Sequence, residues 1–410
     1  MLRLNRYDYL IIIVITSLVF GTMQISIFGQ HFFAAMLCFP LAAKELLIQF
    51  KMYKFKPVVL FMLVWLLYAV LSLIWTNDAK GGFGELFVFV CNAIIFLGLY
   101  HCAQYSIHPQ KTFTIAWILL LLATFPIAFW EILTGNHLEK WGDFNEDYTL
   151  TDAEGYRIDR IFAAVTYKNL NSYVTLLVIA LPIVLSGVIS LKRKLIPLLV
   201  AICAMAIVLI NASRGGLVCL CVILLVFLFH YSKVHFRYKK MFTLLVSVTI
   251  AVILIQYSSF IFTQIVGRLI GFQDNDGLLS DVGRWDVLYL GLKLCYESGG
   301  FGWGVGSMLE AYATTGFWLE FAHNFVIEFL VQYGFWLFIP FALLLIKAFW
   351  RLAFGKNIAL RAYGQMVALS FVPMSIIDDS YLAHPFVWAY LATLLALTDV
   401  SQNSRIEGCE

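Results

Sequence analysis

Residues 323–348 read HNFVIEFLVQYGFWLFIPFALLLIKA, an apolar run that opens with a histidine and an asparagine. A run of this length can cross the ~30 Å hydrocarbon core of a bilayer as a helix. Eleven other runs have similar character, at residues 8–28, 31–48, 57–76, 86–106, 112–133, 168–190, 195–211, 216–231, 241–261, 360–378 and 383–399. The sequence therefore predicts an all-α polytopic membrane protein with about 12 transmembrane helices.

The composition supports this class of protein. Hydrophobic residues make up 61% of the chain and charged residues 13%, about half the ~25% charged residues usual in soluble domains. We find no internal repeat and no soluble segment, so residues 1–410 are expected to form one transmembrane domain. The first run, which starts near Tyr9, has no clean cleavage site after it and is interpreted as a retained helix. The eight cysteines are interpreted as small buried hydrophobic side chains, not as disulfides or metal ligands.

The basic residues predict the orientation. Clusters such as LKRKL and YSKVHFRYKK fall in alternate loops, and cytoplasmic loops are the ones enriched in Lys and Arg. We therefore place both termini in the cytoplasm. The opposite side keeps only these nine of the 28 basic residues: Lys80, Lys140, Arg157, Arg160, Lys168, Arg214, Arg268, Arg284 and Lys293.

Two long loops lie on that second side in this topology, at residues 134–167 and 262–322. Loops of such length usually have a function or their own structure. In the second loop, RWDVLYLGLKLCYESGG (284–300) is typical of a short amphipathic helix on the membrane surface. The glycine-rich stretch GGFGWGVGSM (299–308) follows it.

Polar residues at the start of the 323–348 run are candidates for a site at this face. His323 stands at the outer end of its span, where a neutral imidazole could act as a general base. Asn324, Glu328 and Gln332 recur every four residues, so they share one helix face. That stripe either supports the site or simply hydrogen-bonds neighbouring helices, and we favour the second interpretation for Glu328 and Gln332.

Arginines are the candidate anion ligands. Arg214, in NASRGGL (211–217), stands at a helix start beside two glycines that allow close backbone approach, as in phosphate sites; interfacial snorkelling is the alternative. Arg284 and Arg268 lie in the second long loop, and Arg157 and Arg160 lie in the first. A diphosphate needs several bidentate donors, which arginine supplies best.

A second polar cluster lies in IIDDSYLAHP (376–385). Asp378, Asp379 and His384 could line the cavity, but we favour a structural role at the ends of the last two helices. No sequence feature demands a metal or another cofactor.

Several of these motifs together resemble the bacterial O-antigen ligase and polymerase superfamily. The order is SRGG at a span end, a long loop with GRW and GFGWGVG, then HN opening a span. His323 and Asn324 are followed by nine residues and Gly334, as in the ligase signature, but Leu337 holds the position of its second glycine. The segment FAAVTYKNLNSY (162–173) also resembles the entry to a central span of the family.

The resemblance implies a GT-C-type membrane glycosyltransferase of the inner membrane, with its active site facing the periplasm and no required metal. The donor would be an oligosaccharide on undecaprenyl diphosphate. His323 would take the acceptor proton, and Arg214 and Arg284, with Arg160, would hold the diphosphate. Asn324, Glu328, Arg157 and Arg268 are possible supporting residues.

The acceptor remains open. A second lipid-linked repeat unit would make the enzyme a polymerase, which we favour slightly, and lipid A–core would make it a ligase. A 12-span secondary transporter is a remote alternative, because we find neither paired halves nor polar residues at mid-membrane. A lipid-carrier flippase is disfavoured because the first five spans carry almost no charge. The expected partners are these lipid-linked substrates and membrane lipids, and not nucleic acid.

Overall fold

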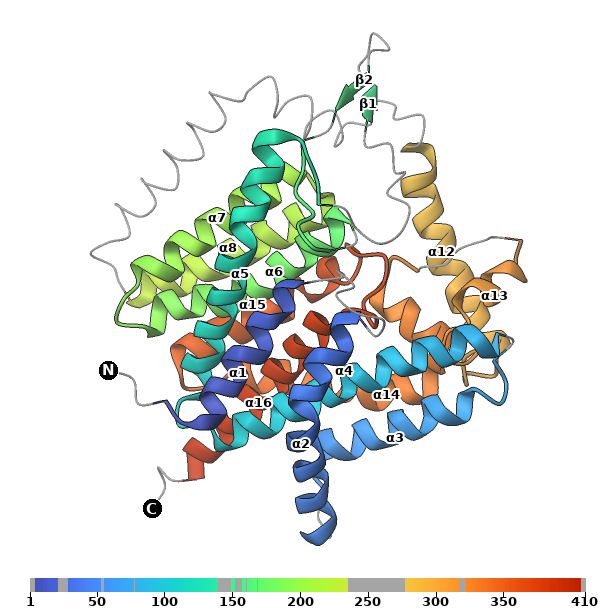
Figure 1. Ribbon diagram of the computed structural model, residues 1–410, viewed down its shortest axis with the longest axis horizontal. Coiled ribbons are helices and arrows are strands. Elements are labelled where there is room, and N and C mark those ends of the chain that lie inside the picture. The colour runs from blue at the N-terminus through green and yellow to red at the C-terminus, as the bar shows by residue number, and fades with distance from the viewer. Residues whose placement is uncertain are drawn as a thin grey trace.

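The computed structural model describes residues 4–20, 29–52, 55–76, 78–138, 149–151, 157–159, 161–167, 169–234, 277–316 and 322–406 (Figure 1). Its helices are α1 (Arg6–Ser17), η1 (Leu18–Phe20), α2 (Gly29–Met52), α3 (Pro57–Ser72), α4 (Ala79–Tyr105), α5 (Pro109–Thr134), α6 (Leu170–Ser190), α7 (Leu195–Asn211), α8 (Arg214–Val234), α12 (Gly277–Glu297), α13 (Met308–Ala313), α14 (Phe325–Ala353), α15 (Ile358–Met374) and α16 (Pro385–Ile406). The predicted helical class is confirmed. The antiparallel pair β1 (Thr149–Thr151) and β2 (Arg157–Asp159) was not foreseen.

Helices occupy eleven of the twelve expected spans, and the remaining one, 241–261, lies outside the described residues. Among the described helices, five are long and apolar enough to cross a membrane: α4, α5, α6, α8 and α14. The pair α2 and α3, bent by 109°, would make a sixth. Helices α7, α15 and α16 are apolar but shorter. The chain is a multi-pass membrane protein, while the count of twelve spans stays a prediction.

Local signals in the sequence explain where the helices begin and end. Pro109 opens α5, where its missing N–H costs nothing, and Gly135 ends it in the left-handed conformation. Asn169 caps α6 by accepting the Ser172 N–H, and Asn357 caps α15. Such caps satisfy N–H groups that have no partner within the helix.

Helix α6 forms the centre of one half of the bundle, because nearly all of its residues are buried. It packs against α5, α7, α8 and α15, while α4 packs against α2 and α16 (Figure 1). The end of α5, the starts of α6, α8 and α14, and the end of α15 lie near one another. We call this the site end of the bundle.

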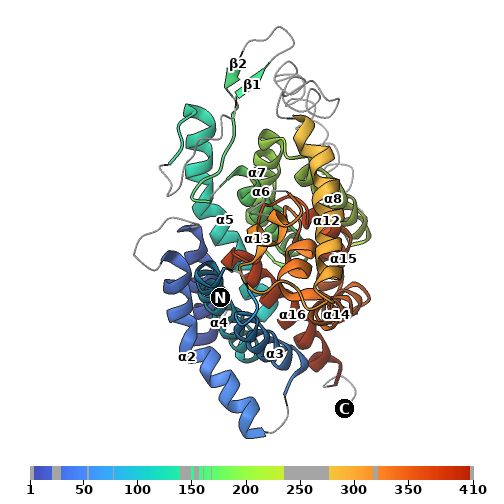
Figure 2. The same ribbon diagram turned by 90° about the vertical axis from the view of Figure 1, so that its right-hand side faces the viewer.

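The described part of the second long loop forms α12, α13 and a glycine-rich turn. Figure 2 shows α12 alongside α13 and α14. A small apolar cluster joins them, with Leu294 of α12, Tyr312 of α13 and Val331 of α14 all buried. Residues 277–313 therefore carry helices that pack onto the helix that follows His323, while their place in a long loop outside the membrane stays a prediction.

Candidate active site

The SRGG motif places Arg214 at the first turn of α8, where its side chain is exposed. A Cβ on Gly215 would meet Ile377 Cγ1 at 2.9 Å, and one on Gly216 would meet Val174 Cγ1 at 2.5 Å. Because neither glycine has a side chain, the start of α8 packs closely against Val174 of α6 and against Ile377, which follows α15. This packing is a different role from the close approach to an anion that the sequence suggested, and the anion site stays a prediction.

His323 lies just before α14 and is held by the connection between α15 and α16 (residues 375–384). Its backbone is left-handed, with φ 47°, and its N–H donates to the Asp379 carbonyl at 3.2 Å. Two residues later, the Phe325 N–H donates to the Ser375 carbonyl at 2.8 Å. The residue as a whole is half-buried, so His323 is anchored through its backbone yet keeps some exposure.

The same connection also contacts the neighbour of Arg214. Ile377 packs against Gly215, and Asp379 binds the backbone of His323. Because a chain advances at most about 3.6 Å per residue, Ile377 and Asp379 are separated by roughly 7 Å or less. One short segment thus brings the turns of Arg214 and His323 together.

The predicted polar stripe separates into three different roles. Asn324 caps α14, its side-chain oxygen accepting the N–H groups of Val326 at 2.9 Å and Ile327 at 3.2 Å. This amide therefore completes its own helix end.

Glu328 holds the 375–384 connection. Its carboxylate is 4% exposed and accepts the Ser380 hydroxyl at 2.8 Å, the Tyr381 N–H at 2.7 Å and the Leu382 N–H at 3.3 Å. A buried carboxylate saturated by such donors fixes one element against another. Glu328 thereby supports the segment that binds His323.

Gln332 faces the glycine-rich turn, its side-chain oxygen accepting the Gly306 N–H at 3.2 Å. Its backbone carbonyl accepts the Gly304 N–H at 3.0 Å. The next turn of α14 is broken at Gly334, with φ 77° and ψ 176°, and a Cβ there would meet the Gly300 carbonyl oxygen at 2.2 Å. Gly334 is therefore the point where the glycine-rich turn inserts against α14.

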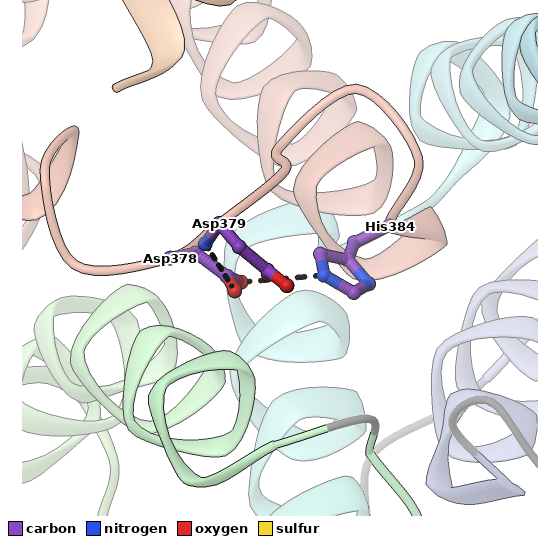
Figure 3. A group of neighbouring side chains, drawn as sticks. All are labelled: Asp378, Asp379 and His384. Atoms are coloured by element: carbon purple, nitrogen blue, oxygen red, sulfur yellow. Dashed lines mark hydrogen bonds and ion pairs between the residues drawn. The ribbon is translucent and has the colours of Figure 1, made fainter. Parts of the chain in front are cut away.

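Asp378, Asp379 and His384 form a buried cluster within the 375–384 connection (Figure 3). His384 Nε2 lies 3.3 Å from Asp378 Oδ2, and Asp378 Oδ1 accepts the Ser172 hydroxyl at 2.8 Å. Asp379 Oδ2 accepts the Asn169 side-chain N–H at 3.2 Å. The cluster thus ties the start of α6 to the segment beside His323.

Burial disfavours the carboxylate and raises the pKa of Asp378 above its ordinary value. Burial would lower the pKa of His384, but the carboxylates of Asp378 and Asp379 outweigh that effect and raise it. Each of the three residues offers one ligand atom within 4.8 Å of the others, so they could together hold a cation. The hydrogen bonds and the His384 ion pair already use most of these atoms.

Sequence reasoning favoured a purely structural role for this cluster. The polar run IIDDSYLAHP was the available signal, but it could not show that the Asp379 carbonyl meets His323. Leu337 of α14, at the place of the second ligase glycine, is buried in the main hydrophobic core of the protein.

Of the other predicted arginines, Arg284 falls in α12 and Arg157 in β2, opposite Thr151. Their side chains, and Arg160 and Arg268 entirely, lie outside the described residues. Their roles therefore stay predictions.

Backbone strain marks the same region. Within the described ranges, three non-glycine residues have left-handed φ values: Val165 at 55°, Ala212 at 48° and His323 at 47°. They lie just before α6, α8 and α14, which all begin at the site end. Such strain persists only where the surroundings enforce it, and it gathers at functional sites.

Comparisons with known proteins find two sequence similarities. Residues 199–342 match the O-antigen ligase family, a region that contains Arg214, Arg284, His323 and Gly334. The teichuronic acid biosynthesis protein TuaE of Bacillus subtilis (strain 168) is 24% identical over 376 residues, covering 85% of this chain and 73% of that protein. The chain is thus similar to the O-antigen ligase family over residues 199–342 and to this relative over most of its length, in line with the resemblance that its motifs suggested.

Proposed function

We propose that this protein is a membrane glycosyltransferase that extends a lipid-linked polysaccharide. It would move a glycan from undecaprenyl diphosphate to a hydroxyl of another lipid-linked repeat unit, at the periplasmic face of a bacterial inner membrane. The observation that carries the proposal is the meeting of two turns on one short segment. Ile377 contacts the neighbour of Arg214, and Asp379 binds the backbone of His323.

The chemistry assigned to His323 is proton acceptance. Its neutral imidazole takes the proton of the acceptor hydroxyl while that oxygen attacks the anomeric carbon of the donor. The bond between the anomeric carbon and the diphosphate oxygen breaks, and its electron pair leaves with the diphosphate. Rigid anchoring of the His323 backbone favours this step, because misplacement of a catalytic group by 1 Å can cost about 100-fold in rate.

Arg214 is assigned to the departing diphosphate. Its exposed side chain lies at a helix start, where N–H groups without helical partners and the helix dipole also attract anions. Preorganised positive charge that meets the growing charge on the leaving group lowers the barrier. Arg284 and Arg160 are proposed as further ligands from their sequence positions, with Arg157 and Arg268 as support.

We favour a polymerase over a ligase because the printed name of the relative concerns teichuronic acid biosynthesis and not ligation. The alternative is transfer to lipid A–core, because the matched family is described as O-antigen ligase. The two reactions share the donor and the roles of His323 and Arg214. They differ only in the acceptor.

The acceptor is tested with purified protein and undecaprenyl-diphosphate-linked repeat units, with products separated on a gel. A ladder of longer lipid-linked chains without any other acceptor is the expected result. Transfer that needs added lipid A–core would establish the ligase instead. If folded protein gives no product under either condition, the proposed function is wrong.

The base is tested with His323→Asn, because asparagine tolerates left-handed φ while lacking a basic nitrogen. We expect loss of transfer with unchanged expression and folding. The matched control is His108→Asn, at an exposed position before α5 whose side chain makes no capping bond. Near-normal transfer by His323→Asn would refute the assignment. Arg214→Ala should raise the KM for the donor more than the KM for the acceptor.

A further inference from the structure

A buried segment contacts elements that lead to both turns of the proposed site, the turn of Arg214 and the turn of His323. Residues 162–167, which we call the strap, precede α6 and are all buried without being helical. Buried backbone groups need partners, and Asn211 supplies two of them. Its side chain accepts the Ala163 N–H at 2.8 Å and donates to the Ala163 carbonyl at 2.8 Å.

Glu131 supplies the next two partners. This residue lies in the last turn of α5 and is completely buried. Its Oε2 accepts the Ala164 N–H at 2.8 Å and the Val165 N–H at 2.7 Å. Val165 is β-branched and has φ 55°, a conformation that such residues rarely adopt. One carboxylate oxygen therefore holds the strap at its strained residue.

The strap leads to both functional turns. Asn211, which binds Ala163, is the last residue of α7 and precedes Arg214 by three residues. At the other end, Asn169 caps α6 and donates to Asp379, whose carbonyl receives the His323 N–H. A shift in the strap would therefore reach Arg214 through one contact chain and His323 through the other.

We propose that Glu131 is a positioning residue for glycan transfer: by holding the strap, it fixes the spacing between Arg214 and His323. The inference rests on the proposed function. Glu131 itself is completely buried, so we assign it no contact with substrate. Its carboxylate faces the strap and His137, whose Nδ1 lies 3.3 Å from Oε1. Loss of the carboxylate would free Val165 to leave the left-handed region and would loosen both turns together.

The activity test compares substitutions that keep or remove the accepted hydrogen bonds. Glu131→Gln retains an oxygen that can accept both N–H groups, so we expect activity within about threefold of wild type. Glu131→Ala removes it, and we expect kcat to fall by about 10- to 100-fold. The donor KM should rise as well, because Arg214 is displaced. Glu297→Ala, at an exposed position of α12, is the matched control and should behave like wild type.

Val165→Gly adds a readout that a merely structural role for Glu131 would not move. Glycine adopts left-handed φ without strain, so the double variant Glu131→Ala/Val165→Gly should recover part of the lost kcat. If Glu131→Ala does not fold, Glu131→Asp replaces it, because its shorter side chain cannot reach both N–H groups. We then expect the same fall in kcat and the same recovery with Val165→Gly. Full activity in the folded Ala or Asp variant, or no recovery with Val165→Gly, would overturn the proposal.

Hydrogen exchange without substrate separates this inference from the proposed function. In Glu131→Ala or Glu131→Asp, exchange should rise in peptides that cover the strap, residues 211–216 and residues 322–326, and Glu131→Gln should stay close to wild type. A rise confined to the strap would show that Glu131 does not act on the two turns. A wild-type protein without transferase activity would instead refute the proposed function. The exchange pattern would still show whether Glu131 acts on the turns of Arg214 and His323 through the strap.

Discussion

We predict that Gly334→Ala lowers the stability of the protein, although alanine is a better helix former than glycine. Gly334 has φ 77° and ψ 176°, a conformation essentially restricted to glycine. A Cβ would lie 2.2 Å from the Gly300 carbonyl oxygen, 2.4 Å from Phe301 C and 2.6 Å from Gly302 N. All three atoms are backbone, so no side-chain rotamer can relieve the clash.

Two costs add at this position. Holding a non-glycine residue in such a conformation costs about 1–3 kcal/mol, and overpacking a tight contact costs about 1–3 kcal/mol more. We therefore expect Gly334→Ala to lose about 2–6 kcal/mol of stability, or to push the glycine-rich turn off α14. Either outcome moves the helix start that carries His323.

Unfolding of the purified protein, followed by tryptophan fluorescence, measures this loss. The signal reports on the junction because the Trp303 N–H donates to the Val331 carbonyl at 2.8 Å and the Trp336 side chain donates to the Gly299 carbonyl at 3.3 Å. Gly84→Ala is the control, since a Cβ there meets nothing within 4 Å. In a helix this change should stabilise by about 0.5–1 kcal/mol. Equal unfolding midpoints for Gly334→Ala and wild type would refute the reasoning.

Two further predictions concern the same end of the bundle. Asn324→Ala should lower the free energy of unfolding by about 0.5–2 kcal/mol because it removes the cap of α14. Asn324→Ser should keep most of that free energy, and the same unfolding assay measures both variants. A loss of transfer without a loss of stability would instead place the amide at the substrate. The raised pKa of His384 favours its protonated form in the folded state, so its contribution to stability is complete below pH 6.5, its ordinary pKa, and is lost as the pH rises through the folded value. Unfolding midpoints between about pH 5 and 9 should therefore fall more steeply in wild type than in His384→Gln, and equal slopes would show that His384 is not the titrating group.

Helix positions could be predicted well where an apolar run ends in strong local signals. The run expected at 195–211 is α7 itself. Helix α5 ends at Thr134, one residue beyond the span expected at 112–133, and Gly135 follows in the left-handed conformation. In the run expected at 8–28, the described part is α-helical to Ser17 and then forms the short helix η1 to Phe20. The rest of that run lies outside the described residues.

The strap shows why composition alone is not enough. FAAVTY (162–167) ends the loop expected at 134–167, and nothing in its pattern indicates that this end of the loop is buried. Its conformation depends on Glu131 and Asn211, which reach it from the ends of α5 and α7. Contacts between distant elements decide such segments, and a single sequence does not contain them in readable form.

The candidate residues fared similarly. His323 and Arg214 could be chosen from position and residue type, and the structure brings their turns to one connection. That Asp379 would serve His323 through its carbonyl could not be predicted, because backbone carbonyls are present at every residue. The side chains of Arg284 and Arg157 lie outside the described residues, and the whole diphosphate site, Arg214 included, stays a prediction.

The dependence of His323 on the 375–384 connection has a consequence for biogenesis. Asp379, Ser375 and the donors to Glu328 follow His323 and all of α14 along the chain, so they are synthesised later. In a nascent chain, His323 and Arg214 are therefore present before the 375–384 connection can orient them relative to each other. Under the proposed function, glycan transfer would therefore begin only after the last two helices have inserted.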